Sequence, residues 1–212
     1  RKWYGNNDEV VKWKNDGVEL RNFKAAVLRN PSYYFKECIS WSLISSSSIA
    51  FRYKPNGHLF DVAGMSCFAN LDVLYYLLGL NNSCLIDEFM LVLAPTINYQ
   101  VGNIANIPVI INEDKKQQIQ QIVKCNIGIS KHEWDSFEIS WDFTKHPLMC
   151  QTDTITEAFE QWQTFTEIEF NKLKGNEEEL NRIFIEIYGL QDELTPEVED
   201  KDVTLRKADL ER

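Results

Sequence analysis

The stretch Tyr33–Gly64, YYFKECISWSLISSSSIAFRYKPNGHLFDVAG, decides the fold that this 212-residue sequence predicts. It is rich in aromatic and β-branched residues, which are typical of strands. Aromatic and cationic residues alternate over Phe51–Lys54, which predicts a strand with one apolar and one basic face. The serine run Ser45–Ser48 predicts a loop or bulge, and Pro55–Gly57 predicts a hairpin turn. We therefore expect two or three antiparallel strands that present a polar, weakly basic surface.

Further strands are predicted on both sides of this stretch. Residues 1–23 contain apolar positions around the turn residues Asn15–Gly17, which predicts a strand, a turn and a second strand. After the hairpin turn, His58–Val62 predicts a returning strand and Gly64–Ala69 another short one. Thr96–Ile111 predicts a loop and then a strand, whose proline favours a sheet edge or a strand start.

Apolar periodicity and capping residues predict five helices, over residues 71–78, 83–93, 113–125, 157–174 and 177–188. The first two are apolar on most faces, which predicts core helices. Gly79, Gly175 and Gly189 are expected to end three of the five. The short link at Gly175 predicts that the last two helices form an antiparallel hairpin. Residues 195–212 are charged and poor in apolar residues, so we expect either a mobile tail or the start of a further segment.

The predicted fold class is therefore α+β: a curved antiparallel-rich β-sheet packed with core helices and followed by a C-terminal helical hairpin. Composition fits a soluble globular protein, with 44% apolar and 25% charged residues. The longest apolar runs are far shorter than the about 20 residues needed to cross a bilayer. Five cysteines without a C-x-x-C spacing indicate reduced thiols in a cytoplasm. The three histidines show no metal-ligand spacing, so we predict no metal site.

Charge is distributed unevenly along the chain. Residues 1–60 carry 10 Lys and Arg against 5 Asp and Glu, residues 61–150 carry 5 against 10, and residues 151–212 carry 7 against 17. A polyanion could therefore meet the basic first part, but not the acidic last part, without strong repulsion. The alternative is that both parts are simply solvated surfaces.

The sequence contains no recognisable catalytic constellation. Asn30–Tyr33 is similar to the Asn-Pro-Pro-Tyr loop of amino-methyltransferases, but it lacks the second proline and too few residues precede it for a βαβ cofactor unit. Gly64–Phe68 resembles a nucleophile elbow without its second glycine. The sequence argues against autonomous catalysis and leaves binding, because serine hydroxyls, cations and aromatics suit phosphates and base edges. The alternative is that the aromatics form the core and the cations face solvent.

Several long segments resemble the specificity region of PglX-like adenine-specific DNA methyltransferases of BREX phage-defence systems, and together they cover nearly all of the chain. They are RKWYGNNDEVVKWKNDG (1–17), the stretch Tyr33–Gly64, YYLLGLNNS (75–83), APTINYQVGNIANIPV (94–109), WDSFEISWDFTKHPLM (134–149) and ELNRIFIEIYGLQDELTPEVEDKD (179–202). The segments LLGLNNS and NIANIPV also resemble specificity subunits of type I restriction systems.

The resemblance implies a target-recognition domain related to the TaqI-like specificity fold, which selects a site on double-stranded DNA. In such families a separate upstream domain holds AdoMet and the Asn-Pro-Pro-Tyr loop, so it implies no cofactor and no catalytic residue in this chain. It also implies that the natural protein extends beyond this sequence. We divide the chain into a target-recognition domain (1–126), a Trp-rich connector (127–150), and an acidic helical hairpin with its tail (151–212).

The residues expected to face DNA are basic, hydroxyl-bearing, amide or aromatic. They are Arg21, Lys36, Trp41, Ser45, Ser46, Ser47, Ser48, Arg52 and Lys54, with Asn98, Gln100 and Asn103 as secondary candidates. The acidic hairpin is expected to pack against the catalytic domain or a partner protein of the defence complex.

Two other functions remain open from the sequence. The chain could be a protein-interaction module that binds other components of the defence complex through Trp134–Phe143 and the acidic hairpin. It could also be an enzyme in its own right, which would require bound AdoMet or a catalytic pocket.

Overall fold

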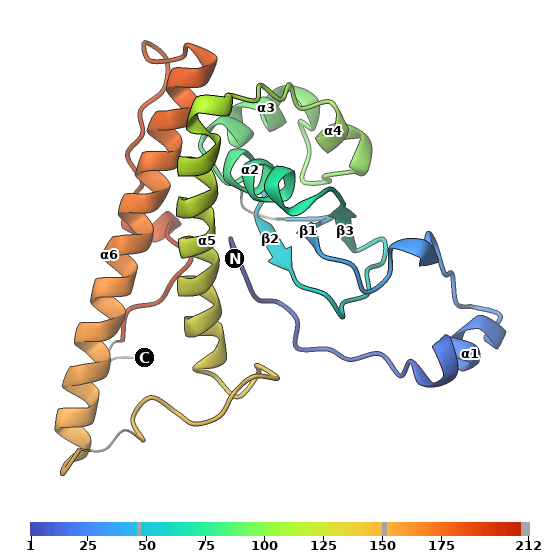
Figure 1. Ribbon diagram of the computed structural model, residues 1–212, viewed down its shortest axis with the longest axis horizontal. Helices are drawn as coiled ribbons and strands as arrows, with labels where there is room; N and C mark the ends of the chain where they lie inside the picture. Colours follow the sequence, from blue (N-terminus) through green and yellow to red (C-terminus); the bar gives the residue numbers. More distant parts are fainter. Residues whose placement is uncertain (46–47, 150–151, 209–212) are drawn as a thin grey trace.

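The structure is a computed structural model that describes residues 1–45, 48–149 and 152–208 (Figure 1). Within these ranges a three-stranded antiparallel sheet and six α-helices form a mixed α+β fold, which confirms the predicted class. The strands are β1 (Cys38–Ser42), β2 (Phe51–Lys54) and β3 (Gly64–Cys67). The helices are α1 (Lys14–Asn22), α2 (Leu71–Asn81), α3 (Leu85–Leu93), α4 (Val101–Ala105), α5 (Glu113–Asp135) and α6 (Ile155–Tyr188).

The sheet has the order β2-β1-β3, with β1 in the centre. In β1, Ile39 lies opposite Tyr53 of β2 and Cys67 of β3. The predicted hairpin between Phe51–Lys54 and His58–Val62 is therefore wrong. The turn after β2 is present, but the chain continues to β3, which pairs with the far edge of β1.

The N-terminal segment explains why His58–Val62 does not pair with β2. Trp3 lies along the outer edge of β2, where its N–H donates to the Phe51 carbonyl at 2.9 Å and its carbonyl accepts from the Tyr53 N–H at 2.8 Å. That edge is already occupied, so a returning strand has no place there. The predicted strand-turn-strand over residues 1–23 is also wrong, because only this short bridge and α1 form there. Asn15–Gly17 does adopt the positive φ values that its turn composition favours.

Helices α2 and α3 are the predicted core helices, but Gly79 does not end α2. A Cβ on Gly79 would lie 3.1 Å from the side chains of both Ile119 and Val123. Glycine at this position therefore permits close approach of α2 to α5. The predicted strand in Thr96–Ile111 is absent, and α4 forms there instead.

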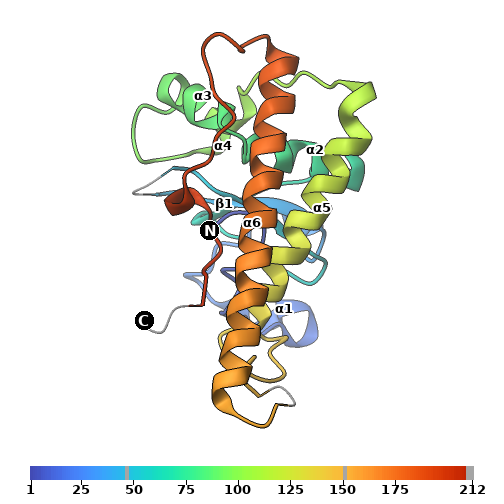
Figure 2. The ribbon, with the colours of Figure 1, turned by 90° about the vertical axis from the view of Figure 1, so that its left-hand side faces the viewer.

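Helices α5 and α6 are long and lie side by side in antiparallel orientation (Figures 1 and 2). Asn112 begins α5 as predicted, since its side chain accepts a hydrogen bond from the Lys115 N–H. The helix then continues past residue 125 to Asp135, so the expected domain boundary at 126 falls inside it. The predicted C-terminal helical hairpin is wrong, because α6 is one 34-residue helix that runs through Gly175. A single interior glycine costs only about 1 kcal/mol, and the apolar face of α6 continues on both sides of it.

The acidic tail is not the mobile segment that its composition predicts. Residues 190–208 run back along α6 (Figure 2). Val203 and Leu205 are buried, and the Ala208 N–H donates to Thr166 Oγ1 at 3.0 Å. An ion pair of 2.7 Å joins Lys174 and Asp200. These contacts fix a segment that has too few apolar residues to be recognised as ordered from its sequence.

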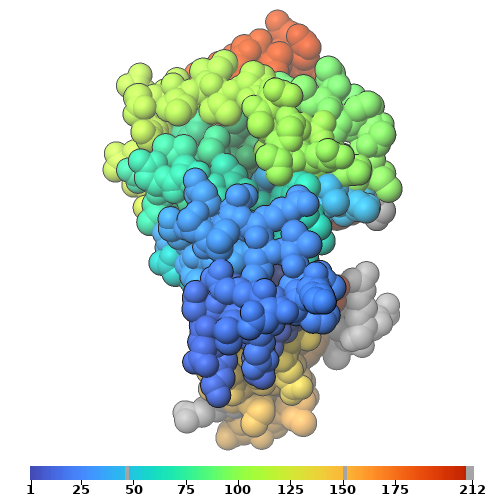
Figure 3. Space-filling view, turned by 90° about the vertical axis from the view of Figure 1, so that its right-hand side faces the viewer, coloured from blue at the N-terminus to red at the C-terminus, as the bar shows by residue number. Residues whose placement is uncertain are grey.

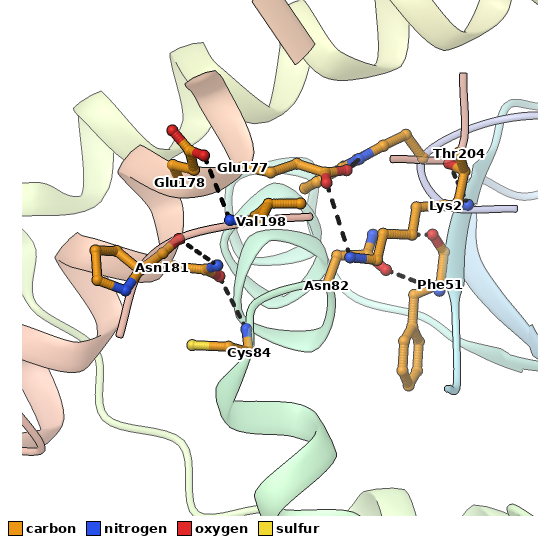
Figure 4. A network of polar contacts seen from close by, with 11 residues as sticks. Lys2, Phe51, Asn82, Cys84, Glu177, Glu178, Asn181, Val198 and Thr204 are labelled. Atoms are coloured by element: carbon orange, nitrogen blue, oxygen red, sulfur yellow. Dashed lines mark hydrogen bonds and ion pairs between the residues drawn. The ribbon is translucent and has the colours of Figure 1, made fainter. Parts of the chain in front are cut away.

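A buried polar network joins the N-terminus, the sheet, α2 and α6 (Figure 4). Trp3 is fully buried, and its indole N–H donates to Glu177 Oε1 of α6 at 2.6 Å. The side-chain amide of Asn82, at the end of α2, donates to the Phe51 carbonyl and accepts from the Phe51 N–H, both at 2.9 Å. Asn181 of α6 accepts from the Cys84 N–H at 2.8 Å. These contacts connect segments far apart in the sequence into one core.

Glu177 should make the stability of this core depend on pH. Burial raises the pKa of its carboxyl above the ordinary value near 4.5, although Lys2, whose Nζ lies 3.8 Å away, and the hydrogen bond from Trp3 lower it. Because the native pKa is raised, the protonated Glu177 carboxyl favours the folded state. This stabilisation is complete below about pH 4.5 and is lost as the pH rises through the native pKa. Glu177→Gln cannot ionise and keeps an acceptor for Trp3. We therefore expect the free energy of unfolding of the Gln variant to increase relative to that of the wild type as the pH rises.

Urea titrations of both proteins at a series of pH values from about 4 to 8 measure this difference directly. A difference that stays constant with pH would contradict the assignment.

Candidate nucleic-acid interface

A segment that we call the basic arm, residues 20–36, projects from the sheet on the side that carries α1 (Figure 1). It contains four cations and no carboxylate. The cations are Arg21, Lys24, Arg29 and Lys36, and all four are exposed. Arg21 is tied to Asp16 by a 3.0 Å ion pair. The arm also exposes apolar side chains, including Phe23 at 63% and Tyr33 at 45%.

An aromatic cluster outside the main core holds the arm in place. The Trp13 ring packs edge-on against Tyr34 and Phe35, each at a centroid distance of 5.5 Å. Tyr34 packs in turn against Phe60 at 5.2 Å. The Phe35 N–H donates to the His58 carbonyl at 2.9 Å. The segment 58–62, predicted as a strand, therefore serves as the platform on which the arm rests.

An open hollow of about 410 Å³ lies at the base of the arm. The rings of Tyr33 and Phe68 line it, with their centroids 4.8 Å apart. The Lys36 Nζ lies over the Tyr33 ring, 5.2 Å from its centroid. The rest of the lining consists of Glu37, Asn56, Ala69, Asn70 and Leu71. The hollow thus combines ring surface, asparagine residues and a cation, which suit contact with nucleotides. Its one carboxylate, Glu37, accepts a hydrogen bond from the Tyr53 hydroxyl at 2.8 Å.

The basic and acidic parts of the chain lie on opposite sides of the molecule. In Figure 1 the arm and α1 are at the right and α6 is at the left, and in Figure 2 α6 is in front with α1 behind. Figure 3 shows that N-terminal residues cover the centre of the face opposite α6. An approaching polyanion would therefore meet the arm without meeting the carboxylates of α6 and the tail.

Arg52 and Lys54, expected on the DNA side, are instead used to anchor the N-terminal segment. Arg52 is 6% exposed, and its guanidinium donates to the Arg1 carbonyl and to Ser42 Oγ. The Lys54 ammonium donates to the carbonyls of Gly5 and Asn6 at 2.9 and 3.0 Å. Burial, and then the charge of Arg52, lowers the pKa of Lys54 to about 8. The expected alternation of apolar and solvent-facing residues in β2 fails because Trp3 and its neighbours cover the basic face.

Trp41 is also buried, and it helps to bring the expected residues around Ser45 close to those around Asn98. Its indole N–H donates to the Tyr99 carbonyl at 2.9 Å. Ile44 bridges Asn98 in antiparallel fashion, and the Ser45 N–H donates to the Ile97 carbonyl at 3.2 Å. Ser45 and Asn98, 53 positions apart in the sequence, are therefore neighbours.

The remaining expected residues differ in their surroundings. Ser48 is exposed but donates to Asp87, whose carboxylate disfavours a phosphate beside it. The Asn103 side chain accepts a hydrogen bond from the Gln100 N–H, which caps α4, and it donates to the Leu93 carbonyl at 2.6 Å. Gln100 is exposed. Ser46 and Ser47 lie outside the described residues.

Lys24 and Arg29 were missed by the sequence reasoning. The signal that could have identified them is the absence of any carboxylate between Glu19 and Glu37. The arm brings them into one segment with Arg21 and Lys36, two of the expected residues.

The Trp-rich stretch Trp134–Phe143, expected to bind protein in the alternative hypothesis, is only partly exposed. Trp134 is buried beneath the Arg1 guanidinium, which lies 5.3 Å from its ring centroid. Trp141 is 66% exposed and donates to the Asp8 carbonyl at 3.2 Å. Part of this stretch therefore serves the internal packing of α5 against the N-terminus.

Comparison with known proteins shows which proteins this chain is similar to. The chain is 42% identical over 226 aligned residues, and over its whole length, to the adenine-specific methyltransferase PglX of Lacticaseibacillus casei (strain Zhang). The chain is PglX-like throughout. The PglX-like sequence is also 35% identical over 198 residues, 92% of the chain, to the adenine-specific methyltransferase BrxX of Escherichia coli O9:H4 (strain HS). It spans 19% of the length of the first relative and 16% of the second. No protein-family model matches the chain.

Among the described residues, no group of three or more His, Cys, Asp or Glu side chains is placed to hold a metal ion. In the same part of the PglX-like chain, no single helix is both long and apolar enough to cross a bilayer.

Proposed function

We propose that this chain is a DNA target-recognition region of an AdoMet-dependent, adenine-specific DNA methyltransferase of BREX type. The observation that carries the proposal is the exposed basic arm on the side opposite the acidic helix α6 in a chain similar to two adenine-specific methyltransferases. The sequence contains no G-x-G motif and no complete Asn-Pro-Pro-Tyr loop. Methyl transfer, AdoMet and the reacting adenine therefore belong to another part of the protein, and this region positions the duplex for it.

This surface offers two kinds of contact with DNA, one to backbone phosphates and one to bases. Lys24, Arg29 and Lys36 are exposed ammonium and guanidinium groups, which neutralise backbone phosphates and fix the register of a protein on DNA. The hollow beside Lys36 offers the amides of Asn56 and Asn70, the type of group that pairs bidentately with adenine in the major groove. The arm supplies affinity and the hollow supplies sequence preference.

Reversing the charge of the arm tests the proposal. We expect Lys24→Glu/Arg29→Glu/Lys36→Glu to weaken binding to a labelled duplex at least about tenfold at low salt, because three attractive interactions with phosphates become repulsive. The log–log slope of affinity against salt should become shallower by about 0.9 for each phosphate that is no longer neutralised. Fluorescence anisotropy of wild type and variant, repeated at several salt concentrations, gives both quantities.

The matched control reverses three exposed cations elsewhere: Lys145→Glu/Lys172→Glu/Arg206→Glu changes the net charge by the same amount. Equal losses of affinity in the two triple variants would mean that only net charge matters and would refute an interface at the arm. Absence of duplex binding by the wild-type chain even at low salt would also count against the proposal.

A further inference from the structure

A second exposed surface, outside the arm and beside the C-terminal end of α6, is apolar. We call it the apolar end, because α3, α4 and the segment that follows α4 lie at one end of the molecule, together with the C-terminal end of α6 (Figures 1 and 3). Its exposed side chains are Leu91, Val92, Ile97, Val101, Val109 and Ile110. Val92 is 80% and Leu91 69% exposed. Clusters of this kind on a folded protein mark binding surfaces.

Specific contacts hold the apolar end in one arrangement. The Asn103 amide of α4 donates to the Leu93 carbonyl at the end of α3. The Tyr188 hydroxyl of α6 donates to the Pro108 carbonyl and accepts from the Ile110 N–H at 3.1 Å. The Tyr188 ring packs against Phe89 of α3. The apolar side chains are therefore displayed on a framework that is fixed before any partner binds.

The charge around the apolar end selects the kind of partner. Residues 55–114 contain no lysine or arginine. Glu88 is exposed and precedes Leu91 and Val92 by one helical turn, so the three share a face of α3. The nearest cations along the chain, at the start of α5, are each paired with a glutamate, Lys115 with Glu186 and Lys116 with Glu113. Such a surface repels DNA phosphates and anionic lipids and attracts cations.

We propose that the apolar end binds a protein helix whose apolar face is flanked by lysine or arginine. An amphipathic helix matches a surface built on a helix face and one adjoining segment, and its basic flanks complement Glu88. The chain spans less than a fifth of each relative, so ample polypeptide of such proteins lies outside this region to supply or recruit the helix. The proposal requires no DNA and stands independently of the role of the arm.

The probe is a synthetic amphipathic peptide of leucine and lysine of about 18 residues, which is about five helical turns. A second peptide carries glutamate in place of every lysine. We expect the wild-type chain to bind the lysine peptide and not the glutamate peptide in fluorescence anisotropy. Leu91→Lys/Val92→Lys should weaken binding of the lysine peptide more than about tenfold, because the substitution removes two apolar side chains from the surface and adds two repulsive charges.

The control variant Ile155→Lys/Ile168→Lys alters two apolar residues of α6 that are also more than half exposed, and it should bind the lysine peptide like the wild type. All four positions are exposed, so the variants should keep the wild-type circular dichroism spectrum. Equal affinity for both peptides, or equal affinity of the Leu91→Lys/Val92→Lys variant and the wild type, would overturn the proposal. Self-association of the wild type that is abolished in that variant, without peptide binding, would also overturn it, since a second copy would then cover the surface.

Discussion

Replacing Trp3 with alanine is expected to lower the free energy of unfolding by about 3–5 kcal/mol, the range measured for large aromatic residues truncated in a core. Trp3 is fully buried, and it contacts both β2, through its backbone, and Glu177 of α6, through its indole. The substitution leaves a cavity and removes the indole N–H that donates to Glu177 Oε1 at 2.6 Å. The buried Glu177 carboxyl then lacks this donor, which lowers the free energy of unfolding further.

Urea denaturation of Trp3→Ala and Trp141→Ala measures the effect against a matched substitution. Trp141 is 66% exposed and makes one hydrogen bond, to Asp8, so we expect its replacement to cost less than about 1 kcal/mol. Similar losses of stability for the two variants would show that the N-terminal segment is not part of the core. A Trp3→Phe variant separates cavity from hydrogen bond, because it retains most of the ring volume and lacks the N–H.

Asn82→Ala should cost about 2–4 kcal/mol, since an unsatisfied buried backbone group costs about 1–3 kcal/mol and removal of the amide adds a cavity. The Asn82 side chain acts toward Phe51 as a neighbouring strand would, with one donor and one acceptor at 2.9 Å each. Asn82 is 3% exposed, so water cannot replace it. After the substitution the Phe51 carbonyl retains the Trp3 N–H, and the Phe51 N–H is deprived of its side-chain acceptor.

Asn82→Asp distinguishes the two halves of this contact. Aspartate keeps an acceptor for the Phe51 N–H but turns an oxygen toward the Phe51 carbonyl, so we expect it to be at least as destabilising as alanine. Asn106→Ala, at an exposed turn after α4, serves as the control and should change the unfolding free energy by less than about 0.5 kcal/mol. Thermal unfolding of the three variants checks the order. A stable Asn82→Asp protein would contradict the geometry drawn in Figure 4.

The sequence located the local features of the fold whose signals lie within a few residues. The aromatic and β-branched stretch around Ile39 and Phe51 contains β1 and β2. Asn112 begins α5 through a side-chain cap, and Gly189, at φ +70°, ends α6 as its residue type predicts. These features depend on backbone preference and on hydrogen bonds between near neighbours, which sequence periodicity reports directly.

The candidate site was only partly accessible to the same reasoning. Lys36 and Arg21, two of the residues expected to face DNA, are exposed on the basic arm, but Arg52 and Lys54 face the N-terminal segment. A strand pattern shows that two residues share a face, and it does not show what covers that face. Trp3 lies 49 positions from Arg52 in the sequence, and this distant pairing turns an expected DNA surface into a core surface.

Three glycines show most clearly what the sequence predicts and what the tertiary structure decides. Gly79, Gly175 and Gly189 carry the same local signal for the end of a helix, and only Gly189 ends one. Gly79 is required by the approach of α5, and Gly175 is tolerated because α6 is held along its length by the rest of the core. By itself the sequence determined the fold class, the resemblance and the places where α2 and α5 begin. Tertiary structure alone decided which edges and faces are covered, because burial against distant segments outweighs local preferences of about 1 kcal/mol per residue.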